Sequence, residues 1–139
     1  MSIVAAIVAS AILCVLGALH FHWAAGGAFG KGAAVPSRDG KPLFTPSALG
    51  TVLVGVALFG AAALVYVTGM ASTPRAHDMV LRVGTGVVAL AFAARAVGDF
   101  KYVGFFKRVR DSDFARRDTH IYSPVCLLLA VVIGAVAFG

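Results

Sequence analysis

Residues 95–126 read RAVGDFKYVGFFKRVRDSDFARRDTHIYSPVC, and this block holds more than half of the charged residues and nearly half of the aromatic residues of the chain. The sequence on both sides of it consists mainly of Ala, Val, Leu and Gly. These apolar runs approach the ~20 residues that an α-helix needs to cross a bilayer. The block therefore predicts a basic, aromatic loop at a membrane surface, between the third and the fourth of four spanning helices.

The overall composition agrees with this interpretation. Of the 139 residues, 60% are hydrophobic and only 13% are charged, and the mean hydropathy is +0.91. Soluble domains are usually about a quarter charged. The composition therefore predicts an integral membrane protein, and the length predicts a single transmembrane domain over residues 1–139.

The apolar runs and the positions of proline predict helices at residues 3–23, 46–70, 79–98 and 122–138. Pro46 and Pro124 would each lie in a first helical turn, where the missing N–H costs nothing. The Gly- and Pro-rich segment 26–46 predicts a loop without regular structure. The connection 71–78 is short, so the second and third helices should be antiparallel neighbours. The predicted fold class is all-α, an up-and-down bundle of four transmembrane helices.

The basic residues predict an orientation, because basic loops stay in the cytoplasm. The loops that follow the first and third helices share one side and hold Lys31, Arg38, Lys41, Lys101, Lys107, Arg108, Arg110, Arg116 and Arg117. Only Arg75 and Arg82 lie near the other side. Both termini should therefore face outward, with these loops in the cytoplasm. The net charge of +6 then indicates membrane lipids as partners and excludes nucleic acid, because basic residues that flank apolar spans attract anionic headgroups.

Two arginines of the third helix are too close together for both to reach the headgroups directly. Arg82 and Arg95 are 13 residues apart, which is roughly 20 Å of helix against a hydrocarbon layer of about 30 Å. Both side chains could extend outward along their stems. Alternatively, Arg95 points into the bundle and pairs with Asp99, one turn further along the same face. The sequence leaves these alternatives open.

Ionisable and aromatic residues gather at the cytoplasmic ends of the predicted helices, and such a cluster is a site hypothesis by default. The candidate ligand-binding residues are His20, Trp23, Arg95, Asp99, Tyr102, Asp118 and Tyr122. His20 and His22 are about 200° apart on a helix, so they cannot face one ion. No metal site is predicted.

Small residues at four-residue spacing would let helices approach closely. Ala57 with Ala61, and Ala130 with Gly134, have this spacing. Packing within the chain explains them as readily as contact with a second copy or a partner membrane protein does, so a homo-oligomer remains open.

Several motifs resemble one bacterial family. They are ALHFHWAAGG (18–27), LFTP (43–46), RAVGDFKYVGFFKRVR (95–110) and FARRDTHIYSPVCLLLA (114–130), and together they resemble the domain of unknown function 3995, whose members are small four-helix membrane proteins. The resemblance implies the fold and a location in the bacterial inner membrane. It implies no activity, cofactor or catalytic residue. The family pattern has an aromatic residue such as Tyr where this chain has His22. This difference weakens any mechanism with two histidines and makes His20 the stronger candidate.

Three functions are compatible with these features. The first is binding or transport of a lipid or a small amphipathic ligand at the polar cluster, with Arg95 contacting an anion. The second is a structural or accessory membrane subunit, in which Arg95 and Asp99 serve folding. The third is an enzyme acting on a lipid-like substrate, in which His20 is the general acid or base and Asp99 or Asp118 orients it.

Overall fold

A computed structural model describes residues 2–71 and 76–139. Its elements are α1 (Ser2–Ala24), α2 (Lys31–Ala34), β1 (Ser37–Arg38), β2 (Lys41–Pro42), α3 (Ala48–Met70), α4 (Ala76–Val97), α5 (Asp113–Arg117), η1 (Asp118–Tyr122) and α6 (Ser123–Phe138). Four helices are long and apolar enough to cross a membrane: α1, α3, α4 and the continuous run from α5 to α6. These helices agree with the prediction of a mainly helical membrane protein. The predicted turn at 72–75, which includes Arg75, lies outside the described residues.

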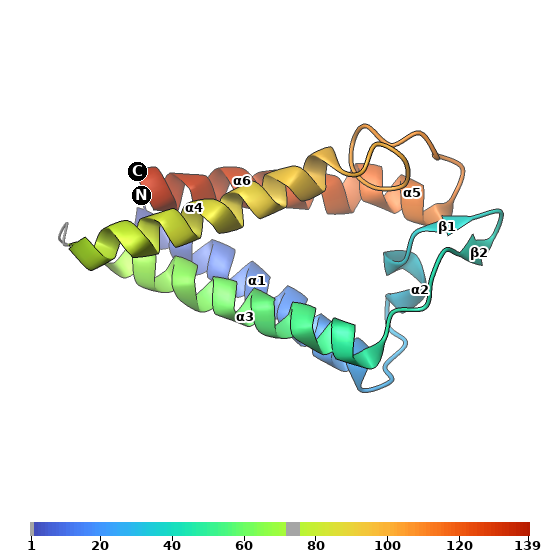
Figure 1. Cartoon of the computed structure of the whole chain (residues 1–139), viewed down its shortest axis with the longest axis horizontal. Coiled ribbons are helices and arrows are strands. Elements are labelled where there is room, and N and C mark those ends of the chain that lie inside the picture. Colours follow the sequence, from blue (N-terminus) through green and yellow to red (C-terminus); the bar gives the residue numbers. More distant parts are fainter. Residues whose placement is uncertain (1, 72–75) are drawn as a thin grey trace.

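The four long helices form two pairs. α1 packs along α3, and α4 packs along α6. Figure 1 shows that the pairs lie together near the termini and diverge toward the opposite end, where both long loops lie. The buried apolar core is in the half near the termini and consists of Ala6, Ala9, Leu13, Ala62, Val65, Ala89, Leu129, Ile133 and Val136. The half near the loops has no such core among the described residues, and it is here that the polar side chains gather.

Glycine sets the distance between α1 and α3. A Cβ atom added to Gly17 would lie 3.3 Å from the carbonyl oxygen of Gly55, and one added to Gly55 would lie 3.3 Å from that of Gly17. About two turns away along both helices, the Ser10 hydroxyl donates to the carbonyl of Ala62 at 2.9 Å. The two backbones therefore pack closely, as small residues allow in membranes. The predicted small-residue pairs did not include these glycines, although Gly134 does face α4 within the chain, where an added Cβ atom would lie 3.9 Å from the Cβ of Ala89.

Polar bonds join the helices near the termini. The hydroxyls of Thr68 in α3 and Thr85 in α4 are 2.8 Å apart. Arg82 of α4 donates from Nε to the carbonyl of Ala137 at 2.8 Å, at the end of α6 where carbonyls lack helical partners. Of the two arginines in this helix, Arg82 thus caps the neighbouring helix.

One predicted helix start was wrong, and one spanning helix is longer than predicted. α3 begins at Ala48, because Ser47 is the N-cap and accepts from Gly50 N at 3.0 Å, so Pro46 precedes the helix. α6 begins at Ser123, one residue from the predicted start and with Pro124 in its first turn, but the continuous spanning helix already begins at Asp113, with Ser112 as its N-cap. This helix runs through the π-helical turn η1 and then past Pro124 into α6. A proline removes one backbone donor, and the wider π turn interrupts the regular bonding just before that position.

The first long loop has regular structure, contrary to the prediction. It contains the short helix α2 and the antiparallel pair β1–β2, in which Ser37 faces Pro42. The turn between the strands is Asp39-Gly40, with φ angles of 53° and 76°. Asp-Gly is a preferred pair for a two-residue hairpin with positive φ at both positions. This dipeptide could have predicted the hairpin, but the high Gly and Pro content of the segment favoured an irregular loop.

Candidate functional site

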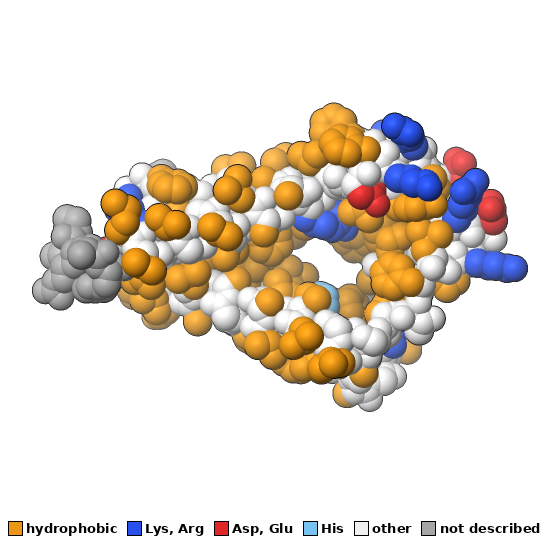
Figure 2. Space-filling view, in the orientation of Figure 1, with side chains coloured by type: hydrophobic (Ala, Val, Ile, Leu, Met, Phe, Trp, Pro, Cys, Tyr) orange, Lys and Arg blue, Asp and Glu red, His pale blue; other side chains and the backbone are white. Residues whose placement is uncertain are grey.

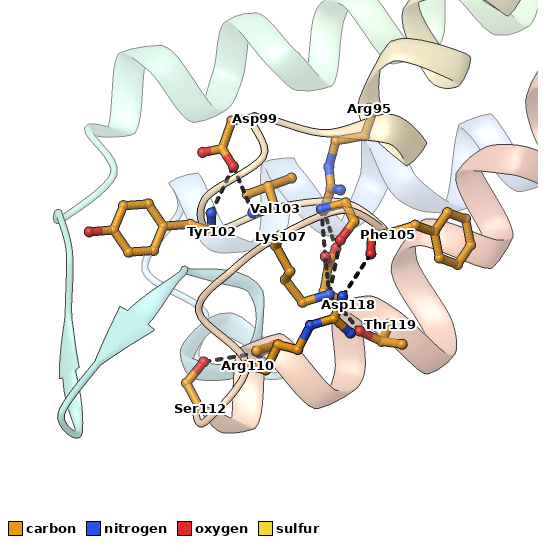
Figure 3. Close-up of polar contacts among 12 residues, drawn as sticks. Arg95, Asp99, Tyr102, Val103, Phe105, Lys107, Arg110, Ser112, Asp118 and Thr119 are labelled. Carbon is orange, nitrogen blue, oxygen red and sulfur yellow. Dashed lines mark hydrogen bonds and ion pairs between the residues drawn. The ribbon is translucent and has the colours of Figure 1, made fainter.

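Asp118 is the centre of a buried charged cluster. Its side chain is 0% exposed, and it lies in the π turn η1. Its Oδ1 accepts from Nη2 of Arg95 at 2.8 Å, and its Oδ2 accepts from Gly104 N at 2.8 Å and from Nζ of Lys107 at 3.1 Å (Figure 3). Asp118 therefore joins three segments: α4, the loop that follows it, and the start of the fourth spanning helix.

Lys107 completes this cluster from the loop. Its side chain is 0% exposed, and Nζ also donates to the carbonyl of Gly104 at 3.0 Å and to the hydroxyl of Thr119 at 2.5 Å. All three ammonium protons thus have acceptors, as a buried lysine requires. Sequence reasoning counted Lys107 among the cytoplasmic loop cations and missed this role.

The alternative that pairs Arg95 with Asp99 was wrong. α4 ends at Val97, and Gly98 has a φ of 85°, so the chain leaves the helix before it reaches Asp99. The i+4 rule holds only while the helix continues. Arg95 pairs with Asp118 from a distant part of the sequence instead.

Asp99 organises the loop. One carboxylate oxygen accepts from the backbone N–H groups of Lys101, Tyr102 and Val103 at 2.9, 2.7 and 3.0 Å; Figure 3 shows the bonds from Tyr102 and Val103. Burial raises the pKa of the Asp99 carboxyl, but these backbone donors outweigh it, so that its pKa lies below the ordinary value of 3.8. Asp99 thus fixes the turn that begins the loop.

This arrangement predicts a pH-dependent contribution to stability. Replacing Asp99 by alanine should lower the free energy of unfolding by about 1 kcal/mol near neutral pH, because an exposed carboxylate that bonds backbone N–H groups of a loop contributes only modestly. Because the folded pKa is below the unfolded one, the contribution is complete above the ordinary aspartate range and is lost as the pH falls through the folded pKa. Thermal unfolding in detergent from pH 7 to pH 3 should show the gap between Asp99→Ala and wild type closing. A gap that is constant across this range would contradict the assignment.

Two glycines close the loop onto the end of α4. Gly98 and Gly104 both have positive φ, 85° and 88°. A Cβ atom at Gly104 would come within 2.5 Å of the Cα of Gly98, and one at Gly98 would overlap the carbonyl of Val103. The N–H of Phe105 donates to the carbonyl of Ala96 at 2.8 Å. This close approach directs the N–H of Gly104 toward Asp118.

His20 and Trp23 lie on the other helix pair. His20 Nδ1 is 2.7 Å from the carbonyl of Leu16 and must donate to it, which leaves Nε2 to face other groups. The rings of His20 and Trp23 are 5.0 Å apart, and Trp23 Nε1 donates to the carbonyl of Phe29 at 2.6 Å. His20 is therefore oriented by its own helix, whereas the predicted orienting residues Asp99 and Asp118 have other partners.

The two tyrosines make contacts within the loops. The Tyr122 hydroxyl donates to the carbonyl of Ala33 at 2.9 Å, and its ring is 5.9 Å from that of Phe114. This bond ties η1 to α2 across the loop end. Tyr102 lies under the ammonium of Lys101, 5.1 Å from the ring centre. Tyr122 thus joins two loop segments, whereas the ring of Tyr102 contacts its chain neighbour.

Among the cavities at this end of the molecule, two are lined by predicted site residues. One, of about 530 Å³, lies between α1, α3 and the first loop and is lined by His20, Trp23, Lys31, Ala34, Val35, Phe44, Thr45, Pro46, Ser47, Gly50, Thr51 and Val54. The other, of about 340 Å³, is a crevice between α3 and α4, lined by Val54, Ala57, Leu58, Ala61, Val87, Val88, Ala91, Phe92 and Arg95. Val54 lines both cavities. Figure 2 shows an opening between the helix pairs, with basic side chains on one rim and a histidine on the other.

The crevice between α3 and α4 has one polar lining residue, Arg95. The Arg95 side chain is 34% exposed, and its Nη1 is buried with no hydrogen-bond partner among the described residues. No group of three His, Cys, Asp or Glu that could hold a metal ion occurs within residues 2–71 and 76–139. The chemistry that this geometry offers is therefore a cation at the end of an apolar groove.

A family model described as "Protein of unknown function (DUF3995)" matches residues 13–133. The chain belongs to this family. The resemblance found in the sequence motifs is thereby confirmed, and the DUF3995 match includes every candidate site residue from His20 to Tyr122. No curated protein and no solved structure matches the chain. Its function must therefore be argued from the site.

The predicted site residues of this DUF3995 protein divide into two groups. Asp99, Asp118 and Tyr122 hold the loops by hydrogen bonds, and Tyr102 contacts its neighbour Lys101 in the second loop. Arg95, His20 and Trp23 line cavities. Sequence reasoning therefore placed these residues together at the loop end of the molecule, but it could not separate those that bond within the loops from those that line cavities.

Proposed function

We propose that this DUF3995 protein binds a lipid or a small amphipathic molecule between its two helix pairs. The apolar part of the ligand lies in the crevice between α3 and α4, and its polar head lies near Arg95. One observation carries the proposal: a charged guanidinium lines a crevice that is otherwise entirely apolar. A charge facing hydrocarbon is costly and usually marks a functional site.

The position of the crevice supports entry of the ligand from the bilayer. α3 and α4 both expose large apolar side chains, such as Leu53 at 59% and Leu90 at 70%. Such surfaces suit contact with lipid tails. A molecule with an apolar chain could therefore move sideways from the bilayer into the crevice without crossing water.

The proposed orientation has the loop end in the cytoplasm of a bacterial inner membrane, with both termini outside. Its support is the excess of Lys and Arg in the two long loops, since basic loops stay in the cytoplasm. In this orientation the head of the ligand lies at the cytoplasmic boundary of the bilayer.

A structural or accessory role is the second candidate. The observation that favours it is the complete burial of Lys107 and Asp118, which is how a folding element is built. The enzyme hypothesis has less support, because the ring of His20 is held by the carbonyl of Leu16 rather than by a carboxylate. One protein can have both a binding role and a folding role. The binding role is therefore tested directly, by looking for a bound molecule.

The test is native mass spectrometry of the purified full chain with a phenylalanine placed in the crevice. In wild type we expect one discrete bound amphiphile. Ala57→Phe should remove it, since Ala57 lines the crevice and the added ring would fill the space. Ala63→Phe is the matched control, because Ala63 is also an exposed residue of α3 and does not line the crevice. Both variants should fold with the same yield.

The opposite result is equally clear. A wild-type chain without bound mass, even after incubation with membrane lipid extract, would contradict binding and favour the accessory role. Equal loss of the ligand in Ala57→Phe and Ala63→Phe would show that it does not lie in the crevice.

A further inference from the structure

The charged cluster at the end of the crevice contains more positive than negative charge. Two cations, Arg95 and Lys107, share the single carboxylate of Asp118. Asp99 bonds backbone N–H groups and Asp113 pairs with Arg116, and Asp111 lines a separate cavity beside the first loop. The cluster therefore carries one positive charge that no contact with a described carboxylate neutralises.

Arg95 is the member of the cluster that can present this charge to a ligand. Lys107 is fully buried and all its protons are used. Arg95 is one-third exposed, uses Nη2 for Asp118, and keeps Nη1 without a partner. A guanidinium presents its donors in a planar fork that suits the oxygens of a phosphate or a carboxylate. Arg95 also lines the crevice, so a small rotation of its side chain would bring this fork to a ligand there.

The size of the crevice limits the apolar part of the ligand. Its volume of about 340 Å³ is near the lower end for sites that enclose a small molecule. This space suits one chain rather than two.

We infer that the ligand head bound at Arg95 is an oxyanion, a phosphate or a carboxylate, carried on a single apolar chain. This inference rests on the proposed function, because the chain occupies the crevice. The oxyanion would neutralise the excess charge of the cluster and accept from the guanidinium. Arg95 would then hold Asp118 on one side and the ligand on the other.

The test compares three probes in a neutral maltoside detergent: dodecyl phosphate, dodecanol and inorganic phosphate. Trp23 is the only tryptophan of the chain and lines the adjoining cavity, so its fluorescence reports binding, and native mass spectrometry gives the stoichiometry. We expect dodecyl phosphate to bind at least about tenfold more tightly than dodecanol, since hydrogen bonds to charged groups are strong. Inorganic phosphate should bind far more weakly, because it lacks the chain.

Arg95→Lys tests the role of the second guanidinium nitrogen. Lysine keeps a cation for Asp118 but has no planar fork, so the preference for dodecyl phosphate over dodecanol should fall to about threefold or less. Arg82→Lys is the matched control, in the same helix at the opposite end, and should keep the wild-type preference. If Arg95→Lys does not fold, the comparison of the three probes on wild type still decides the question.

The outcomes separate this inference from the proposed function. Equal binding of dodecanol and dodecyl phosphate to wild type, lost in Ala57→Phe, would overturn the anionic head and leave the crevice as the binding site. Inorganic phosphate binding as tightly as dodecyl phosphate, with no effect of Ala57→Phe, would show a free-anion site and overturn both. Binding of neither alkyl probe would also overturn both.

Discussion

Replacing Asp118 by alanine is expected to destabilise the protein by about 3–5 kcal/mol, the usual cost of removing one partner from a buried ion pair. The variant would leave the ammonium of Lys107 at 0% exposure with no carboxylate, and it would free the N–H of Gly104. Thermal or denaturant unfolding in detergent, followed by circular dichroism, should detect a loss of this size.

Asp113→Ala is the matched control. Asp113 also pairs with an arginine, Arg116, but the two side chains are 79% and 73% exposed. Surface pairs of this kind contribute only ~0–1 kcal/mol. Equal stability of the Asp118→Ala and Asp113→Ala variants would contradict a folding role for the buried cluster.

A second variant tests the reason for this effect. Adding Lys107→Met to Asp118→Ala removes the buried ammonium that has lost its carboxylate, so the double variant should recover part of the stability. Residues in direct contact do not have additive effects. If the double variant is less stable than Asp118→Ala alone, the unpaired lysine is not the source of the loss.

Replacing Gly104 by alanine is expected to be comparably severe, at about 3–5 kcal/mol. A side chain at a φ of 88° is strained, at an order of 1–3 kcal/mol, and its Cβ would also collide with the backbone at Val97 and Gly98. Both partners of this collision are main chain, so the loop must open to relieve it. The N–H of Gly104 would then leave Asp118, and the yield of folded protein should fall.

Gly26→Ala separates the two causes. Gly26 has a similar φ of 95°, but a Cβ there would meet nothing within 4 Å. It should therefore show the backbone strain alone, and the difference between the two variants measures the close approach of the loop to α4. Equal losses of stability in Gly26→Ala and Gly104→Ala would mean that the loop is not packed against the helix as described.

Most of the membrane-spanning structure could be predicted from the sequence. α1, α3 and α4 begin and end within three residues of the predicted ranges. This succeeds because hydropathy and helix length are local properties, and a run of ~20 apolar residues has few other uses. The two long loops were also recognised, because Gly, Pro and charge interrupt those runs.

Pairing between distant residues could not be predicted in the same way. The spacing of Arg95 and Asp99 indicated a helical pair, yet Gly98 turns the chain between them and the partner is Asp118. Lys107 looked like one more loop cation, because a sequence does not distinguish a buried lysine from an exposed one. Its acceptors come from residues 104, 118 and 119 and exist only once the loop has closed.

The sequence by itself determined that this chain has four apolar helices, where its basic residues lie, and that it belongs to its family. These follow from composition and order along the chain. Only the tertiary structure decided that α1 pairs with α3 and α4 with α6, that an apolar crevice ends at Arg95, and that Asp118 leaves one positive charge of the cluster unmatched. The physical reason is that burial and electrostatic balance depend on which groups meet in space, and that depends on packing between segments far apart in the chain.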